Sequence, residues 1–243
     1  MTDRKIAFIG DSVTAAANVA LSQRWPHMVG VAAGYLDGNI VNAGVPGDKS
    51  AQMRARFTAD AMIHNPAVIG FMMGVNDAAN GISLSTHEAN YRSMIEEAKA
   101  GGAKVAIITP PIYRQNVAGW RTWHAKWLEL ATVYECPLVD ISRAYGWEYV
   151  ADSSVFNALY VNSTDLVHQS AAGNSRIAAI CCEPQHIGAF RPDVPQPADP
   201  VCSCQPGQTD ELSLALVDLQ LYGATPARLS RLASAMANQL EEV

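Results

Sequence analysis

Residues 5–13 read KIAFIGDSV, a short apolar run that leads into a Gly-Asp-Ser turn. An apolar run of this length between turn-forming residues is typical of a parallel β-strand that is buried on both faces. Four runs of the same kind recur along the chain, at 39–41, 67–73, 104–109 and 138–141. Segments with helical spacing lie between these runs, at 26–35, 50–62, 86–100 and 120–134.

This alternation predicts an α/β domain of three layers, with a central parallel sheet of about five strands and right-handed crossover helices on both faces. The helix predicted at 86–100 has a capping-box pattern at 85–88 and a Gly-Gly stop at 101–102. In sheets of this kind a ligand binds beyond the carboxyl ends of the strands. The segments that directly follow the strands are therefore the first place to look for a functional site.

The composition is that of a folded, mildly acidic protein. Of the 243 residues, 49% are hydrophobic and 16% are charged, and the formal net charge is -6. The chain has no run of Lys or Arg, which argues against nucleic acid as a partner, because phosphate binding needs a concentrated basic surface. No apolar stretch is long enough to span a bilayer, and the N-terminal residues do not resemble a signal peptide. These features predict a protein that is cytoplasmic at synthesis and has no membrane partner.

The pattern changes near residue 182 and predicts three parts. Residues 1–182 form the main domain, 183–207 contain six prolines and read as a linker, and 208–243 form a mostly helical C-terminal extension. An extension of this length is too short to hold a core of its own. It must pack on the main domain or on another chain, so a homo-oligomer that forms through the extension is one expectation.

The cysteines allow two interpretations. They are Cys136, Cys181, Cys182, Cys202 and Cys204. An odd number without a signal peptide favours reduced thiols over a disulfide framework. A zinc cluster of the last four is the alternative, but structural zinc sites usually place roughly two to four residues between paired thiolates. Free thiols fit the spacing better, so we expect no metal.

Four short motifs carry the chemistry: GDS at 10–12, GVPGD at 44–48, GVND at 74–77 and DLVH at 165–168. Each alone has an ordinary interpretation, as a helix cap, a turn or an exposed loop. Together they predict a serine beside backbone and side-chain amides at the strand ends, with a carboxylate placed to orient a histidine. The other histidines, at positions 27, 64, 87, 124 and 186, have no carboxylate and strand end placed in this way.

In this order the motifs resemble the four blocks of the SGNH hydrolase family, also called GDSL lipases and esterases, over about residues 5–180. The resemblance implies a flavodoxin-like fold and a serine esterase that needs no metal or cofactor. By motif position it implies Ser12 as the nucleophile, His168 as the general base and Asp165 as the acid that orients His168. An acyl-enzyme would form on the serine and be released by water.

The resemblance also implies three donors for an oxyanion hole. These are the backbone amides of Ser12 and Gly47 and the side-chain amide of Asn76. Two features depart from the family pattern. Gln169 follows the histidine where proline is usual, which predicts a looser turn there, and the tail after residue 182 has no counterpart in the minimal family fold.

The substrate is less constrained by the sequence. Residues 110–127 follow the fourth predicted strand and are rich in aromatic and basic side chains. At the rim of the sheet, Tyr113 and Trp120 could stack on a sugar, which favours a short-chain or carbohydrate O-acetyl esterase acting on a small-molecule or glycan ester. The alternative is that the tryptophans at 120, 123 and 127 are core residues, because their spacing is helical. A second class of function is a virion-associated phage component that uses an SGNH-like domain to bind or trim glycans.

Overall fold

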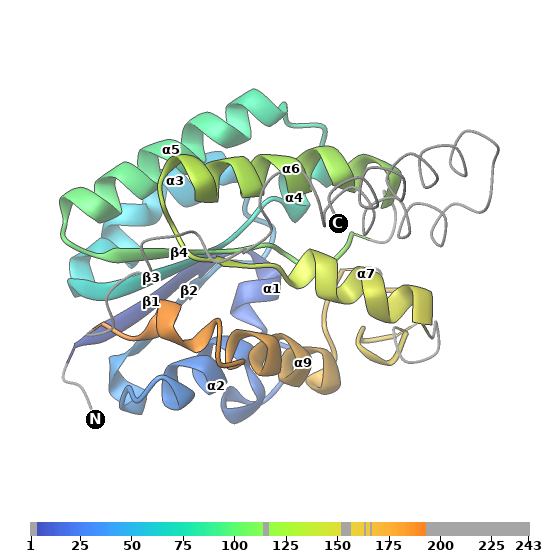
Figure 1. The fold of residues 1–243 in the computed structure, drawn as a ribbon, viewed down its shortest axis with the longest axis horizontal. Helices are drawn as coiled ribbons and strands as arrows, with labels where there is room; N and C mark the ends of the chain where they lie inside the picture. The colour runs from blue at the N-terminus through green and yellow to red at the C-terminus, as the bar shows by residue number, and fades with distance from the viewer. Residues whose placement is uncertain (1–3, 114–116, 152–156, 163, 166, 193–243) are drawn as a thin grey trace, which may run out of the picture.

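The computed structural model describes residues 4–113, 117–151, 157–162, 164–165 and 167–192. Its centre is a sheet of five parallel strands in the order β2-β1-β3-β4-β5 (Figure 1). The strands are β1 (Lys5–Gly10), β2 (Ile40–Gly44), β3 (Pro66–Met72), β4 (Lys104–Ile108) and β5 (Leu138–Val139). This sheet confirms the predicted fold, and it places the first strand between the second and the third.

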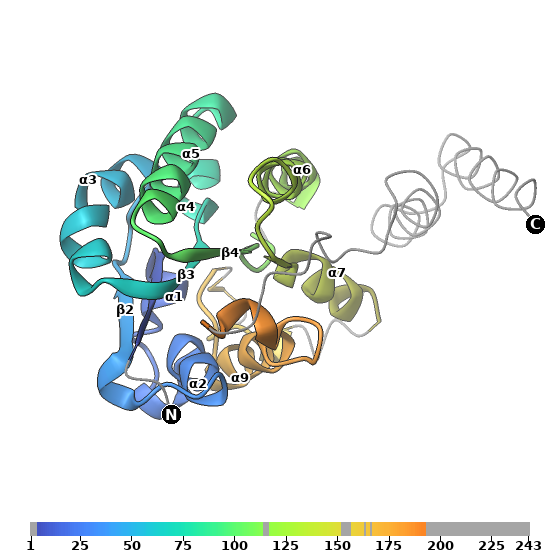
Figure 2. The same cartoon turned by 60° about the vertical axis from the view of Figure 1, so that its left-hand side comes forward.

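Helices cover both faces of the sheet (Figure 1, Figure 2). Helices α3, α5 and α6 lie on one face and α2 and α9 on the other, with α7 beside α9. The helices are α1 (Ser12–Ala15), α2 (Trp25–Ala32), α3 (Ser50–Asp60), α4 (Val75–Ala79), α5 (Leu84–Ala100), α6 (Val117–Val133), α7 (Ile141–Ala151) and α9 (Ala171–Cys181). The sequence pattern did not predict α4, α7 or α9.

The start of α5 corrects the predicted capping box at 85–88. The helix begins at Leu84, and the hydroxyl oxygen of Ser83 accepts a hydrogen bond from the amide of Thr86 at 3.1 Å. An N-cap serine serves an amide two or three residues further on, so the cap lies before the predicted box and the helix starts earlier. Gly101 caps the other end, as the sequence predicted.

The core is organised around β1, whose side chains from Ile6 to Ile9 are fully buried. The ring of Phe8 meets Trp25 of α2 edge to face, with ring centroids 5.1 Å apart, and it meets Phe190 at 6.0 Å. Phe190 is itself fully buried and ends a short 3-10 helix, Ile187–Phe190. Burying such a ring stabilises the fold by roughly 1.5–3 kcal/mol. The folded domain therefore extends to residue 190, and the predicted start of the linker at residue 183 is wrong.

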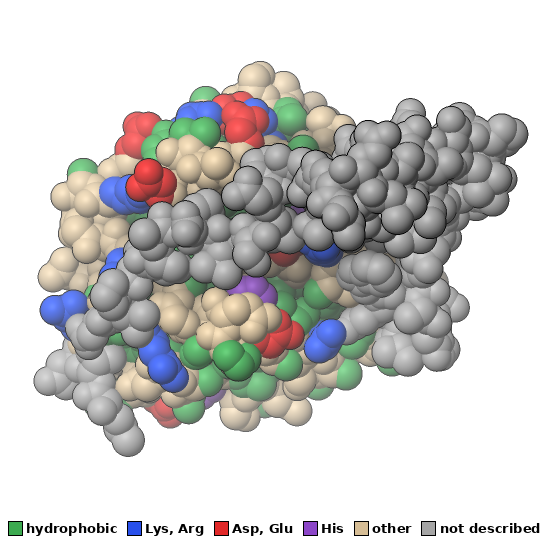
Figure 3. Space-filling view, in the orientation of Figure 1, with side chains coloured by type: hydrophobic (Ala, Val, Ile, Leu, Met, Phe, Trp, Pro, Cys, Tyr) green, Lys and Arg blue, Asp and Glu red, His purple; other side chains and the backbone are tan. Residues whose placement is uncertain are grey.

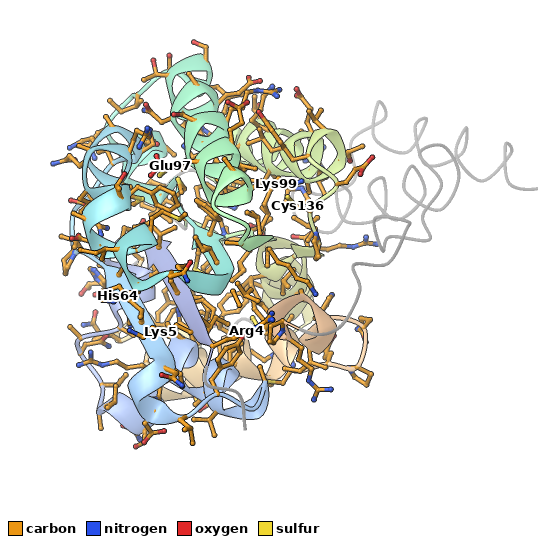
Figure 4. All side chains as sticks on the ribbon, turned by 90° about the vertical axis from the view of Figure 1, so that its left-hand side faces the viewer. Arg4, Lys5, His64, Glu97, Lys99 and Cys136 are labelled. Carbon is orange, nitrogen blue, oxygen red and sulfur yellow. The ribbon has the colours of Figure 1, made fainter. Side chains whose placement is uncertain are left out.

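The remainder of the predicted linker, the extension at 208–243 and the cysteines at 202 and 204 lie outside the described residues. The expectations of an oligomer formed through the extension and of a virion component therefore stay predictions. Cys136, Cys181 and Cys182 are free thiols, and burial raises the pKa of Cys136 to about 11. Figure 4 looks onto the end of the sheet where Lys5 begins β1, and Cys136 lies just before β5.

Within the part of the chain that the structure describes, no three His, Cys, Asp or Glu side chains come together in a way that could hold a metal ion. Among the described helices, none is both long enough and apolar enough to cross a bilayer. On the face drawn in Figure 3, the visible Lys and Arg side chains are scattered rather than gathered into one basic patch.

Candidate active site

The carboxyl ends of β1, β2 and β3 lie side by side, with Gly10 in register with Gly44 on one side and Met72 on the other. The chain turns sharply after β1 into α1, which packs against the end of β2. A Cβ on Gly44 would lie 2.2 Å from the backbone nitrogen of Ala15, and a Cβ on Gly10 would lie 2.3 Å from the carbonyl oxygen of Met72. Only glycine permits this close approach, so the two glycines allow the helix that begins at Ser12 to sit against the sheet.

Ser12 is the first residue of α1 and is half-buried. Its hydroxyl oxygen lies 3.0 Å from Nε2 of His168, a residue 156 positions later in the chain. The other ring nitrogen of His168, Nδ1, lies 2.9 Å from Oδ2 of Asp165. The structure thus brings the three predicted triad residues into one continuous chain of hydrogen bonds.

Asp165 is held by more than the imidazole. Its Oδ1 accepts the backbone amides of His168 at 2.8 Å and Val167 at 3.1 Å. Partial burial alone would raise the pKa of Asp165, but the two amides and the His168 ring outweigh it and lower the pKa below its usual value. The carboxylate is therefore ionised at neutral pH and accepts a hydrogen bond from Nδ1–H, which leaves Nε2 free to accept the proton of Ser12.

Gln169 corrects the expectation of a loose turn after the histidine. Its side chain is buried, its Oε1 accepts the hydroxyl of Tyr145 at 2.9 Å, and its Nε2 donates to the carbonyl of Val167 at 3.0 Å. Its backbone carbonyl accepts Asn18 at 2.8 Å. Gln169 thus fixes the turn through three polar atoms and their partners, where proline would fix it through its ring. His168 itself keeps 45% of its side chain exposed, so a substrate can reach it from solvent.

Two of the three predicted oxyanion donors, Gly47 and Asn76, follow β2 and β3. Gly47 has φ +84°, a left-handed conformation that favours glycine. Asn76 lies in the first turn of α4, and its Nδ2 donates to the carbonyl oxygen of Asp48 at 2.9 Å. This bond joins the third motif to the loop of the second. A side-chain amide carries two N–H groups, so Asn76 retains one for a ligand.

Two of the histidines set aside in the sequence lie within hydrogen-bond distance of a carboxylate. His87 Nδ1 lies 2.7 Å from Asp77 Oδ2, and His124 Nε2 lies 2.8 Å from Asp140 Oδ2. The His87 pair is fully buried, and Nε2 of His87 accepts the indole N–H of Trp127 at 3.1 Å. Because no solvent reaches it, this second Asp-His pair serves the structure: Asp77 also accepts the amide of Ser50 and so joins α4 to α3. No local pattern in the sequence signals these contacts.

The two residues predicted to bind sugar are buried and do not present their rings to solvent. Tyr113 and Trp120 are 9% and 4% exposed, and their rings pack at a centroid distance of 6.3 Å. The indole of Trp120 also donates to Ser142 Oγ at 3.1 Å. Trp127 is buried as well. The alternative interpretation, in which the aromatic residues of α6 form core, describes these two tryptophans correctly.

Asp11, the residue before the serine, is a buried carboxyl group. Its Oδ1 accepts the amide of Val13 at 2.9 Å and so caps α1, whereas its Oδ2 has no hydrogen-bond partner among the described residues. Burial raises the pKa of Asp11 to about 7, against the lowering effect of the Val13 amide and of His168; the charges of Asp77 and Asp48 raise it further.

We expect this carboxyl group to make stability depend on pH. The unfolded chain loses the Asp11 proton near the ordinary aspartate pKa of 3.8, whereas in the native state the pKa is raised to about 7. Between these values the native state binds more protons, so the free energy of unfolding falls as pH rises from about 4 to 7. Urea denaturation across this pH range should show the free energy of unfolding of the wild type falling relative to that of Asp11→Asn as the pH rises. A constant difference would contradict the raised pKa.

Comparison with known proteins supports the chemistry that this geometry suggests. The model of the GDSL-like lipase/acylhydrolase family matches residues 8–176. Esterase TesA of Pseudomonas aeruginosa is 35% identical over 111 residues, which are 43% of this chain and 55% of that protein. Thioesterase 1/protease 1/lysophospholipase L1 of Escherichia coli is 28% identical over 139 residues, which are 55% of this chain and 64% of that protein. The chain thus aligns with less than two thirds of the length of either relative.

Solved structures share the fold over a larger part. An acetylxylan esterase of Geobacillus stearothermophilus, Axe2, superposes with a TM-score of 0.61 at 21% identity, covering 77% of this chain and 95% of that one. The acetyl xylan esterase AlAXEase superposes with a TM-score of 0.62 at 21% identity, covering 72% of this chain and 96% of that one. At this identity the likeness concerns the fold.

Proposed function

The chain belongs to the GDSL-like lipase/acylhydrolase family, and on this premise we propose that it is a serine esterase that removes short acyl groups, first of all acetyl groups on carbohydrates. The observation that carries the esterase proposal is the hydrogen-bonded chain from Asp165 through His168 to Ser12. A serine is a weak nucleophile until an adjacent base takes its proton. His168 is the base within reach, and Asp165 holds it in the tautomer that can accept the proton.

The proposed reaction has two steps, acylation and deacylation. In acylation, Ser12 Oγ attacks the ester carbonyl while its proton passes to Nε2 of His168. The tetrahedral oxyanion then collapses, and His168 returns the proton to the leaving alcohol. In deacylation a water molecule attacks the acyl carbon while its proton passes to Nε2 of His168. The tetrahedral oxyanion then collapses, the acid leaves, and His168 returns the proton to Ser12 Oγ.

The oxyanion formed in both steps needs preorganised donors. We assign this role to the amides of Ser12 and Gly47 and to the second N–H of Asn76. Their support is the arrangement of the loops: Ser12 follows β1, Asn76 follows β3, and the carbonyl of Asp48, next to Gly47, accepts Asn76. Donors held in place before the reaction stabilise the oxyanion without reorganisation, which is usually the largest single contribution to acyl transfer.

Two sets of similar proteins bear on the choice of acyl group. The structural neighbours include two acetyl xylan esterases, whereas the curated relatives are named Esterase TesA and Thioesterase 1/protease 1/lysophospholipase L1. The first pair favours acetyl groups on sugars, and the lysophospholipase name in the second pair favours longer acyl chains. The two classes of substrate differ in the length of the acyl chain that the site must accommodate.

A panel of p-nitrophenyl esters tests this choice, with acetyl, butyryl, octanoyl and dodecanoyl groups and Ser12→Ala as the background. We expect kcat/KM to be highest for acetyl and to fall at least about tenfold by octanoyl, because each methylene that does not fit costs roughly 1 kcal/mol or more. Release of acetate from acetylated xylo-oligosaccharides should also depend on Ser12. A kcat/KM that rises with chain length would contradict the short-acyl proposal and leave the esterase proposal standing.

A further inference from the structure

Arg56 contacts the loops that carry Ser12 and Gly47 but takes no part in the proton transfers of the proposed reaction. It is in the middle of α3, the helix that begins just after the Gly47–Asp48 loop, and its side chain is 17% exposed. Helical side chains lean toward the N-terminus of their helix, so the guanidinium reaches back toward that loop. Its sequence position gives no hint of this, because its partners come from three separate segments.

The guanidinium donates to four oxygen atoms. Its Nε donates to Asp48 Oδ2 at 2.6 Å, and one terminal nitrogen donates to the carbonyl of Gly10 at 3.0 Å. The other terminal nitrogen donates to the carbonyl of Ala43 at 2.8 Å and to Asp60 Oδ2 at 3.1 Å. One planar cation thus joins the end of β1, the end of β2 and the loop after β2.

Each of these segments leads to a predicted oxyanion donor. Gly10 stands two residues before Ser12, and Asp48 directly follows Gly47. The carbonyl of Asp48 also accepts the side chain of Asn76, so the third donor is tied to the same aspartate. Along these contacts, at most two residues therefore lie between Arg56 and each of the three donors.

We infer that Arg56 is a positioning residue that sets the geometry of the oxyanion hole; this inference rests on the proposed esterase function. Arg56 acts through Asp48 and Gly10. Its charge is matched by the carboxylates of Asp48 and Asp60. Lysine cannot replace it, because an ammonium group offers its donors from one point, whereas the guanidinium fork reaches acceptors in several directions.

The same helix supplies a matched control. Arg54 is also an ion-paired arginine, with Nε donating to Ser93 at 2.8 Å and a terminal nitrogen 2.9 Å from Glu97. Its partners lie on α5. Removing either arginine deletes one positive charge and its ion pairing, with two carboxylates for Arg56 and one for Arg54. Of the two, only Arg56 contacts the segments that carry the oxyanion donors.

The test compares Arg56→Ala, Arg56→Lys and Arg54→Ala with the wild type, using p-nitrophenyl acetate at a temperature where circular dichroism shows each variant folded. We expect kcat of Arg56→Ala to fall roughly a hundredfold, as when an oxyanion donor is lost, with KM changed by less than about threefold, since the ground-state ester does not need these donors. The kcat of Arg56→Lys should fall nearly as far as that of Arg56→Ala. Arg54→Ala should keep kcat within about threefold.

Added guanidinium chloride, at a concentration below denaturation, should raise kcat of Arg56→Ala and leave Arg54→Ala unchanged. A role in stability alone predicts a lower Tm, an unchanged kcat in the folded variants and no rescue. If Arg56→Ala does not fold, Arg56→Lys decides, because it keeps the charge: wild-type kcat in this variant would overturn the inference. Ester turnover that survives Ser12→Ala would instead overturn the proposed function, so the two failures are distinguishable.

Discussion

Replacing Ser12 with alanine is expected to lower kcat for p-nitrophenyl acetate by roughly 10^4-fold or more. Its hydroxyl makes the bond to His168 Nε2, and its side chain is half-buried at the start of a four-residue helix. Alanine fits this position and leaves the cap from Asp11 in place. Circular dichroism and Tm of the variant should therefore match the wild type while turnover is lost.

Ser83→Ala is the matched control for this experiment. Ser83 also stands at a helix start and caps α5, so its loss should cost stability of roughly 1 kcal/mol with no change in kcat. If Ser12→Ala hydrolysed the ester as fast as Ser83→Ala, another group would have to be the nucleophile. The domain would then be better described as a binding module on a hydrolase fold.

Asp165→Asn is expected to lower kcat nearly as far, by about 10^4-fold. The two backbone amides that Asp165 Oδ1 accepts fix how an asparagine must sit, with its oxygen toward the amides of Val167 and His168. Its NH2 group then faces Nδ1 of His168 and donates to it. The imidazole proton moves to Nε2, which can no longer accept the proton of Ser12.

The pair formed by His124 and Asp140 offers the control for this substitution. Asp140 Oδ1 also accepts a backbone amide, that of Arg143 at 3.0 Å, and the carboxylate bonds to a histidine. Asp140→Asn therefore makes the same chemical change without touching Ser12, and we expect kcat within about threefold of the wild type. An Asp165→Asn variant that retained a tenth of wild-type kcat would contradict the assigned tautomer.

The sequence was sufficient for the fold because the strands are buried on both faces and read as continuous apolar runs, as in β1 and β3. The sequence was less informative where a buried helix face is not marked by apolar residues. Helix α9 reads AAGNSRIAAIC; its buried face includes Gly173 and Asn174, whereas Ala172 and Ala179 are exposed, so the sequence shows no apolar stripe. Phe190 was missed because its apolar run, residues 187–190, is short and lies in a segment rich in prolines, and only its contact with Phe8 shows that it is core.

The candidate site was predictable where a motif is local. Asp165 and His168 are three residues apart, and Ser12 follows a recognisable strand. Residues whose partners are distant in sequence gave no signal: Arg56 reaches Gly10 across 46 positions, and His87 pairs with Asp77 through a buried contact. Aromatic composition was misleading for Tyr113 and Trp120, because composition cannot tell a buried ring from an exposed one.

Covalent labelling identifies the nucleophile without relying on a substituted serine. A serine-directed fluorophosphonate should react with the wild-type chain, and after tryptic digestion the adduct should lie on the peptide of residues 6–24, which contains Ser12 and Ser22. Fragmentation of that peptide should place the adduct on Ser12, and Asp165→Asn should label far more slowly. An adduct on Ser22 or another peptide, or no adduct in a preparation that hydrolyses the ester, would contradict Ser12 as the nucleophile.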